Sequence, residues 1–527
     1  MIRLVFMVFG CLVLSFGAVA KSKSKSKKLE KKLVNKEFNR LLELYKMRAM
    51  KPGMLWRKFG DIQSHRLLTP GKKLFIHQIQ AELLLRDGFP VLAASYASNV
   101  LKKAAKPLST SYVPSWAILE KVSRIKPIQF ILEDLSLSLN LNGKIPPKFG
   151  QSWNYFVGNA LVTQGFDEKG LAFFKRVPLS SRYFMPAKYQ IGMIDYSKGR
   201  FKSARGSLRA ILHPSTDDTT PLGNEQKLEM RNYAHMALGR ILYEQKKFIN
   251  SARQFRLVNK ESPLFYDALY EQSWALFMSG NPNHALGSLY GAGSTYFNDI
   301  YNPEAKVLEA VVYYWMCRYG DARNSLADFA QRYSESVESL SDYIDRRKFS
   351  PKSGYHLFEN LVTGVSSEAL GIPRDVLQNA ANRDTMLLVR EQLASVMMEA
   401  ERLQNKGIFR SNSYTRYPLK KIDGLRKVLR DQLGTQFVME LKRERENYEK
   451  LYSQSQFLYL ELLMSEKEQL LGRELHASSK VSGKASYEEI MGWGRNTQGW
   501  KGDRLGEYWW DEIGFHIVQA KSKCVQK

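Results

Sequence analysis

Cysteine is scarce in this sequence, with three residues in 527. No two of them form a CxxC pair, which argues against a structural zinc site or a thioredoxin-type redox site. Cys11 lies in an apolar stretch at the N-terminus, and only Cys317 and Cys524 lie beyond it. In an oxidising compartment two such thiols can pair.

Motifs that carry catalysis or bind cofactors are also missing. The eight histidines form no HExxH, HxH or CxxH pattern, and there is no GxSxG turn or phosphate-binding glycine loop. Carboxylate pairs such as Asp217-Asp218 lie in polar surroundings, whereas catalytic pairs need burial to shift their pKa values. The sequence therefore predicts a protein that is not an enzyme, with no cofactor and no metal. A glycan-cleaving enzyme built on helical repeats is the alternative, although no general acid can be named.

Beyond the N-terminus the sequence has no uncharged apolar run long enough to cross a membrane. Residues 1–20 have the pattern of a secretory signal, with an apolar stretch from Leu4 to Phe16 and small residues at Ala18 and Ala20. We expect export across the inner membrane, cleavage after Ala20 and a periplasmic mature protein. A lipid anchor on Cys11 is the alternative, because the residues before it are similar to a lipobox.

Acidic residues are few relative to basic ones, since 52 Asp and Glu against 79 Lys and Arg give a formal net charge of +27. Such an excess favours polyanionic partners, which outside the cytoplasm are acidic lipids, lipopolysaccharide or cell-wall polymer and not nucleic acid. Lysine alternates with serine between Lys21 and Lys32, so residues 21–36 are expected to form a disordered basic tail. A solvated arm and a tether to a membrane surface or wall polymer are both open roles for this tail.

Small residues recur at a fixed spacing from about residue 74 onwards. Gly158, Gly165 and Gly170 are separated by seven and then five residues, and the same spacing returns 34 residues further on. The middle residue of each set is expected to lie in a turn, and the fourth set has one extra residue. The sets are Ala81, Gly88 and Ala93; Gly158, Gly165 and Gly170; Gly192, Gly199 and Ala204; Gly239, Lys246 and Ala252; Ser273, Gly280 and Ala285; and Ala310, Cys317 and Ala322.

Two antiparallel helices explain this spacing. Small residues let the helices approach where they cross, and a turn with a left-handed backbone favours glycine. A helix–turn–helix period of 34 residues resembles the tetratricopeptide repeat (TPR) family, over about residues 74–332. The resemblance implies an all-α solenoid that binds other proteins along its concave face. The sequence departs from the family at Ser273 and Ala310, which stand where a glycine is usual, and it lacks most of the prolines that end a repeat.

The repeat domain is expected to cover residues 37–332, with linking helices over residues 333–384. Residues 385–475 predict a long antiparallel helical hairpin or coiled coil, because apolar residues follow heptad spacing on both sides of a polar loop. A homodimeric coiled coil is the alternative, because Glu444 interrupts the second stripe, as do two serines. The stripes consist of Met386, Val389, Leu393, Val396, Ala400 and Leu403, and of Phe437, Leu441, Tyr448, Leu451, Leu458 and Leu462.

Residues 476–527 form a C-terminal segment that is rich in tryptophan. We expect this segment to dock on the repeats, because so aromatic a stretch is unfavourable in water. The alternative is a patch that binds a partner protein or a glycan. The tryptophans concerned are Trp493, Trp500, Trp509 and Trp510.

The positions of the two remaining cysteines predict a disulfide. Cys317 occupies the turn of the last clear repeat, and Cys524 follows the aromatic stretch that is expected to dock on the repeats. The alternative is a pair of free thiols, with Cys317 packed as a small apolar residue.

Aromatic stretches at residues 296–322 and 508–514 point to a narrower group within this family. They resemble envelope TPR proteins of gliding and predatory bacteria, some of which belong to adventurous gliding motility complexes. This resemblance implies a place in a trans-envelope motility or secretion complex. We therefore expect a non-enzymatic periplasmic scaffold that binds other envelope proteins through its repeats. The alternative is a factor that binds or remodels cell-wall peptidoglycan with its basic surface and terminal tryptophans.

Overall fold

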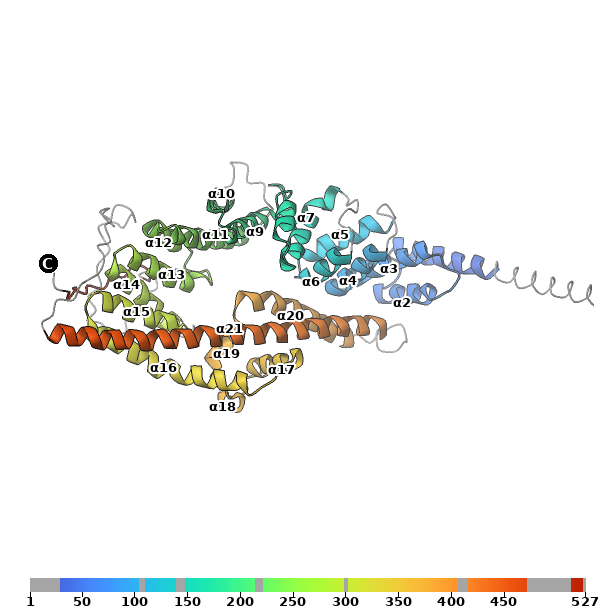
Figure 1. Ribbon diagram of the computed structural model, residues 1–527. Helices are drawn as coiled ribbons and strands as arrows, with labels where there is room; N and C mark the ends of the chain where they lie inside the picture. Colours follow the sequence, from blue (N-terminus) through green and yellow to red (C-terminus); the bar gives the residue numbers. More distant parts are fainter. Residues whose placement is uncertain are drawn as a thin grey trace, which may run out of the picture. The chain divides into compact units, whose positions relative to one another are not determined.

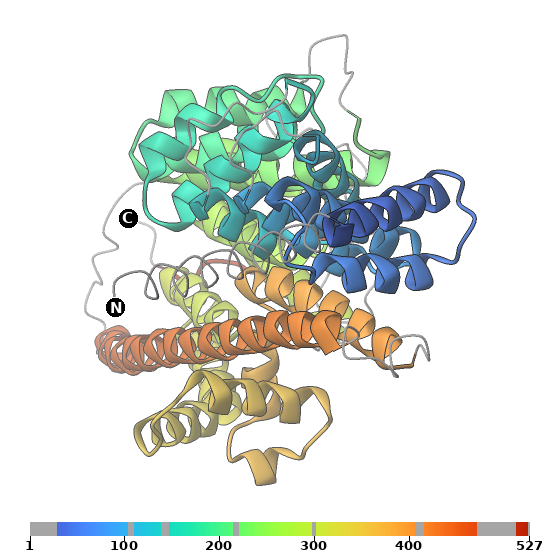
Figure 2. The same cartoon turned by 90° about the vertical axis from the view of Figure 1, so that its right-hand side faces the viewer.

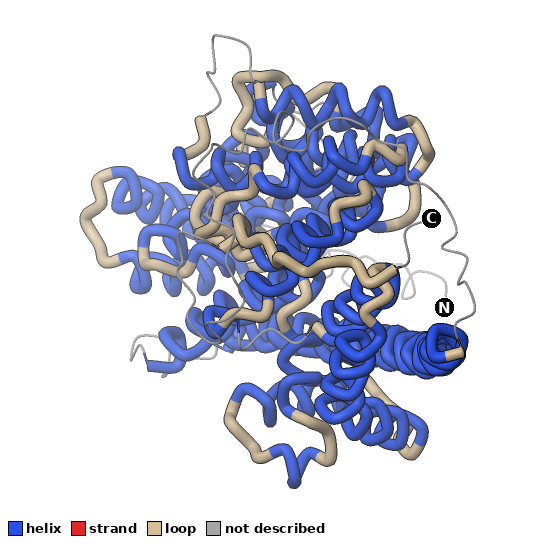
Figure 3. The backbone as a smooth tube through the Cα atoms, turned by 90° about the vertical axis from the view of Figure 1, so that its left-hand side faces the viewer, coloured by secondary structure: helices blue, strands red, loops and turns tan. Residues whose placement is uncertain are grey.

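The computed structural model describes residues 29–103, 110–138, 147–213, 221–297, 302–405, 416–471 and 513–524 (Figure 1). Every regular element in these ranges is a helix, and none of them contains a β-strand (Figure 3). The protein is thus all-α, as the sequence predicted. None of the helices in the described ranges combines the length and the apolar character needed to cross a membrane.

The chain divides into two compact units. Unit 1 comprises residues 1–160 and 388–430, and unit 2 comprises residues 161–387 and 431–527. The boundaries fall inside three helices, which are α7 (Pro147–Thr163), α20 (Asp384–Asn405) and α21 (Arg416–Leu470).

Unit 1 begins with a helix over residues 29–46, whose first part belongs to the stretch predicted to be a disordered tail. The structure differs from that prediction because Phe38 and Leu41 are buried and the helix carrying them extends back through the lysines. The prediction for residues 21–28 lies outside the described residues. The other helices of this unit are α2 (Pro52–Gln63), α3 (Pro70–Arg86), α4 (Pro90–Lys103), α5 (Tyr112–Ser123) and α6 (Gln129–Ser138).

Unit 2 consists mainly of consecutive helix pairs, in each of which a first helix is followed after a short turn by a second. Three short helices and the C-terminal half of α21 follow these pairs. The pairs are α9 (Phe184–Ser197) with α10 (Phe201–Leu212), α11 (Asn224–Glu244) with α12 (Phe248–Arg256), α13 (Phe265–Met278) with α14 (Pro282–Ala292), and α15 (Pro303–Trp315) with α16 (Tyr319–Asp345). The remaining elements are α8 (Asp167–Phe174), η1 (Thr295–Phe297), α17 (Pro351–Val362), α18 (Ser367–Leu370) and α19 (Arg374–Ala381).

The six turn positions that the sequence singled out share one backbone conformation. In every case φ lies between +56° and +83°, and the amide of the next residue donates a hydrogen bond to the carbonyl five residues before it. This is the Schellman motif that ends a helix and reverses the chain. The turn residues are Gly88, Gly165, Gly199, Lys246, Gly280 and Cys317.

Helix α16 crosses the expected end of the repeat domain at residue 332 without a break. The sequence predicted that the repeat domain ends there and that separate linking helices follow. The helix continues because apolar residues recur on its buried face, with Phe329 followed by Leu340 and Ile344. The expected boundary therefore falls inside one helix.

The two long helices form an antiparallel pair over only part of their length (Figures 1 and 2). Thr385 Oγ1 at the start of α20 donates to Glu440 at 2.8 Å. Asn379, which precedes α20 on α19, donates to Tyr448 further along α21 at 3.4 Å, so the chain before the loop and the chain after it run in opposite directions. Beyond this point α21 packs on the last helix pair, where Leu458 lies against Leu326 and Leu462 against Ala322. The apolar stripe of α21 therefore packs against two parts of the protein, which are the chain before the loop and the α15–α16 pair. The sequence predicted only the first of these, as a simple hairpin.

Candidate protein-binding face

The small residues that define the repeats lie where the sequence placed them, at helix crossings and turns. A Cβ atom added at Gly192 would lie 2.9 Å from Leu208 Cγ, and one added at Gly239 would lie 2.5 Å from the Phe255 ring. Ser251 Oγ also donates to the Gly239 carbonyl at 2.7 Å. Buried positions are Gly158, Gly170, Gly192, Ala204, Gly239, Ala252, Ala285, Ala310 and Ala322, while Gly199 and Gly280 lie in turns.

Successive first helices are joined to one another by side chains that are half-buried or exposed. The rings of Tyr189 on α9 and Tyr233 on α11 lie 5.7 Å apart at 64°. Tyr270 on α13 donates to Glu304 on α15 at 2.8 Å. We call these and their neighbours the first-helix face, which consists of Tyr189, Tyr196, Tyr233, Arg240, Glu244, Tyr270, Glu271 and Glu304.

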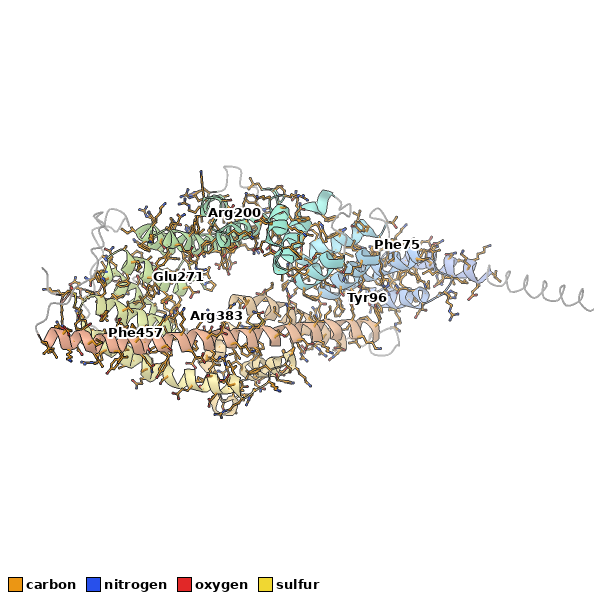
Figure 4. The ribbon with its side chains drawn as sticks, viewed as in Figure 1. Phe75, Tyr96, Arg200, Glu271, Arg383 and Phe457 are labelled. Carbon is orange, nitrogen blue, oxygen red and sulfur yellow. A yellow bond between two sulfur atoms is a disulfide. The ribbon has the colours of Figure 1, made fainter. Side chains whose placement is uncertain are left out.

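Charged hydrogen bonds organise the middle of the first-helix face. Arg240 donates from Nε to both oxygens of the Glu271 carboxylate and from Nη2 to one of them, the shortest of these bonds being 2.5 Å. These bonds raise the pKa of the guanidinium (Figure 4 labels Glu271). Tyr196 donates to Glu244 at 2.6 Å, and burial together with this carboxylate raises the pKa of Tyr196 to about 12. The face therefore presents tyrosine hydroxyls together with three glutamates and one arginine.

The buried carboxylates elsewhere are engaged by protein groups. In unit 2, Asp195 accepts from Arg200 at 2.8 Å, and Glu440 accepts from Gln436 at 2.9 Å. Arg383 donates to Glu444, the residue that interrupts the predicted stripe (Figure 4 labels Arg383). Within the described ranges, no cluster of three or more His, Cys, Asp or Glu side chains is arranged to hold a metal ion.

The C-terminal residues 513–524 dock on the helix pairs of unit 2. Ile513 is fully buried against Phe265 and Leu269, and the Val518 amide donates to the Asn283 carbonyl at 3.1 Å. Trp493, Trp500, Trp509 and Trp510 lie outside the described residues, so the structure leaves their expected role open.

A disulfide joins Cys317 and Cys524, the pair that the sequence singled out. A backbone hydrogen bond beside the disulfide joins the same two segments, because the Lys523 amide donates to the Met316 carbonyl at 3.0 Å. The tail is therefore attached at the turn between α15 and α16, by a covalent bond and by a backbone hydrogen bond.

Sequence reasoning did not find the contacts between first helices or the group that caps α4. Each contact joins residues about 30 or more positions apart, and their types are common on helix surfaces. In unit 1, Glu399 on α20 accepts from the amides of Val91 and Leu92, where a local capping side chain is usual. The sequence contains only an indirect sign of this distant cap, because no residue beside Pro90 has a side chain that could cap α4 locally.

Comparison with known proteins yielded no match, either to a protein-family model or to a curated protein.

Proposed function

We propose that this protein is a non-enzymatic periplasmic scaffold with TPR-like repeats, and that its first-helix face binds a segment of another envelope protein. The observation that carries the proposal is the row of tyrosines and charged groups that crosses four successive first helices. In repeat proteins the second helices cover the first helices on one side, so the opposite side is free to receive a partner.

The chemistry of the first-helix face suits a peptide or helix. Tyrosine provides a large contact area with little loss of side-chain entropy, and it is enriched where partners bind strongly. Three carboxylates against one guanidinium favour a partner segment that carries lysine or arginine. Specificity would then come from both charge and aromatic contacts.

Export supports the periplasmic part of the proposal, and it rests on the sequence of residues 1–20. The disulfide between Cys317 and Cys524 agrees with an oxidising compartment. N-terminal sequencing of the native protein should find Lys21 as its first residue. An intact Met1 or a lipidated Cys11 would contradict this proposal.

A site-specific photo-crosslinking experiment in cells tests the binding face. A photoreactive amino acid is placed at Tyr189 or Tyr270 on the first-helix face, and at Arg209 on the exposed side of α10 as the control. We expect one defined protein partner to crosslink from the two tyrosine positions and not from Arg209. Equal crosslinking from all three positions, or none, would contradict the proposed face.

The affinity of the identified partner gives an independent measure. Tyr189→Ala should weaken binding about tenfold or more, because tyrosines at interface centres are frequent hot spots, while Arg209→Ala should leave it unchanged. If the partner belongs to a motility or secretion machine, the narrower proposal of a trans-envelope complex gains support. Strong, salt-sensitive retention of the mature protein on insoluble peptidoglycan, without a protein crosslink, would favour the wall-binding alternative instead.

A further inference from the structure

A cavity of about 690 Å³ opens in unit 1, whereas the first-helix face belongs to unit 2. Helices α2, α3 and α4 form its walls, and Tyr417 from α21 completes it. Its volume lies in the range of sites that bind small molecules. Its lining includes aromatic, basic and amide side chains, which are Trp56, Lys73, His77, Gln80, Tyr96 and Lys103.

Three residues that line the cavity carry buried polar atoms that have no protein partner. Tyr96 is 1% exposed and its hydroxyl makes no hydrogen bond (Figure 4 labels Tyr96), although its ring packs edge-on against Trp56. Gln80 is 2% exposed and donates to the Trp56 carbonyl at 3.4 Å, but its Oε1 accepts nothing. Buried polar atoms left without partners are costly, so such groups in a cavity point to a bound molecule.

The third such atom is His77 Nδ1, which also has no hydrogen-bond partner. Burial and the charge of Lys103 lower the pKa of His77 to about 4, so the imidazole is neutral at neutral pH. A neutral imidazole offers one acceptor nitrogen and one donor nitrogen. Together with Gln80 Oε1 and the Tyr96 hydroxyl, it matches a ligand that bears hydroxyl groups, since a hydroxyl both donates and accepts.

The charged side chains that line the cavity are all positive. Lys73 and Lys103 line the cavity, and no Asp or Glu side chain is among its lining residues. Lys102 and Lys421 lie close by in the same unit, where Asp134 pairs with Lys102. This concentration of ammonium groups favours an anion.

We infer that this cavity binds a small hydroxylated organic anion, such as a sugar acid or a sugar phosphate. The carboxylate or phosphate lies by Lys73 and Lys103, and the hydroxyl groups reach Gln80, Tyr96 and His77. The aromatic rings of Trp56 and Tyr96 supply an apolar wall for the carbon skeleton. This site is independent of the proposed protein-binding face.

Isothermal titration calorimetry on the mature full-length chain tests the inference. The probes are glucuronate, galacturonate, glucose 1-phosphate and glucose 6-phosphate, with glucose and inorganic phosphate as matched controls that lack the charge or the hydroxylated skeleton. We expect at least one charged sugar to bind about tenfold or more tightly than either control. The carboxylate and phosphate probes distinguish the two kinds of anion.

Three variants locate the binding site. Lys73→Met and Tyr96→Phe should each weaken the bound probe about tenfold, whereas Lys58→Met, on an exposed position of α2, should leave it unchanged. Tyr96→Phe should fold with an unchanged or higher melting temperature, because it removes a hydroxyl that has no protein partner.

Several outcomes would overturn the inference. One is that no charged sugar binds more tightly than the controls, whatever the melting temperature of Tyr96→Phe; a lower one would then mean that the cavity holds ordered water only. Another is that inorganic phosphate binds as tightly as the sugar phosphates. A third is that Lys73→Met and Lys58→Met weaken binding equally, which would mean non-specific charge attraction.

Discussion

Gly239 and Gly206 are both glycines within helices, yet a methyl group would meet different surroundings at the two positions. At Gly239 the added Cβ would lie 2.5 Å from the buried Phe255 ring, whereas at Gly206 no atom lies within 4 Å. Glycine at the first position is required by the close approach of α11 and α12. Glycine at the second is only a poor helix former.

The same substitution should therefore have opposite effects at these two sites. Gly239→Ala is expected to lower the free energy of unfolding by about 1–3 kcal/mol through overpacking. Gly206→Ala should raise it by about 0.5–1 kcal/mol, because alanine has the higher helix propensity. Urea unfolding followed by circular dichroism measures both. Equal effects would mean that α11 and α12 do not pack as described.

Lys246 occupies a left-handed turn in which most of the equivalent positions are glycine, with φ at +58°. A side chain is strained in this region, at a cost of about 1 kcal/mol. Lys246→Gly should thus raise the melting temperature, while Arg209→Gly in the interior of α10 should lower it. A lower melting temperature for Lys246→Gly would show that contacts of the lysine side chain stabilise the fold by more than the left-handed backbone destabilises it.

At the scale of elements, α20 stabilises the start of α4 inside unit 1. Glu399 accepts from the Val91 amide at 2.6 Å and the Leu92 amide at 3.0 Å, and Arg402 lies by the carbonyl of Gly88. A carboxylate at a helix N-terminus is favourable, yet burial dominates here and raises the pKa of Glu399 to about 7 from 4.5.

This shift predicts a pH dependence of stability. Between about pH 4.5 and 7 the folded protein keeps a proton on Glu399 that the unfolded chain has released, so the free energy of unfolding falls as pH rises. The loss reaches about 3 kcal/mol at most. Glu399→Gln should remove it, so the variant should gain stability relative to the parent between pH 5 and pH 8. A difference between the two proteins that does not change with pH would contradict this.

The C-terminal tail is a second element, and one of its contacts leaves no room for a side chain. A Cβ at Gly287 on α14 would lie 1.8 Å from the His516 carbonyl oxygen, so any side chain displaces the tail backbone. Phe515 is also held, with Arg256 4.6 Å and Lys260 5.1 Å from its ring centroid.

Gly287→Ala should accordingly release the tail while leaving the helix pairs folded. We expect faster trypsin cleavage after Lys521 and Lys523, with helical content unchanged. Gly293→Ala is the control, because the nearest atoms to its Cβ are 3.5 Å away. Unchanged cleavage in Gly287→Ala would mean that the tail is not seated on α14.

At the scale of the whole molecule, the Cys317–Cys524 disulfide closes a loop of 207 residues. Loop-closure entropy gives such a bond about 4–5 kcal/mol, although measured gains are often smaller. The bond attaches the end of the chain to the turn of the last helix pair. It stabilises that pair and the docked tail together.

The disulfide makes a direct prediction for the native mature protein. Under denaturing, unreduced conditions a maleimide should label no cysteine, and after reduction it should label two. Reduction should also lower the urea midpoint, and it should have no further effect on the double variant Cys317→Ser/Cys524→Ser. Labelling of two cysteines before reduction would reject the bond.

The sequence by itself determined the helical class, the turn positions and the small residues at helix crossings. These features are local, because helical periodicity and the preference of glycine for left-handed turns act over a few residues. The tertiary structure alone decided the rest: the division into two units, the continuation of α16 past residue 332, and the two partners of α21. It also decided the cap on α4 by Glu399 and the lining of the cavity. These depend on contacts between residues as much as about 300 positions apart, whose choice is set by packing of the whole chain and leaves no local pattern.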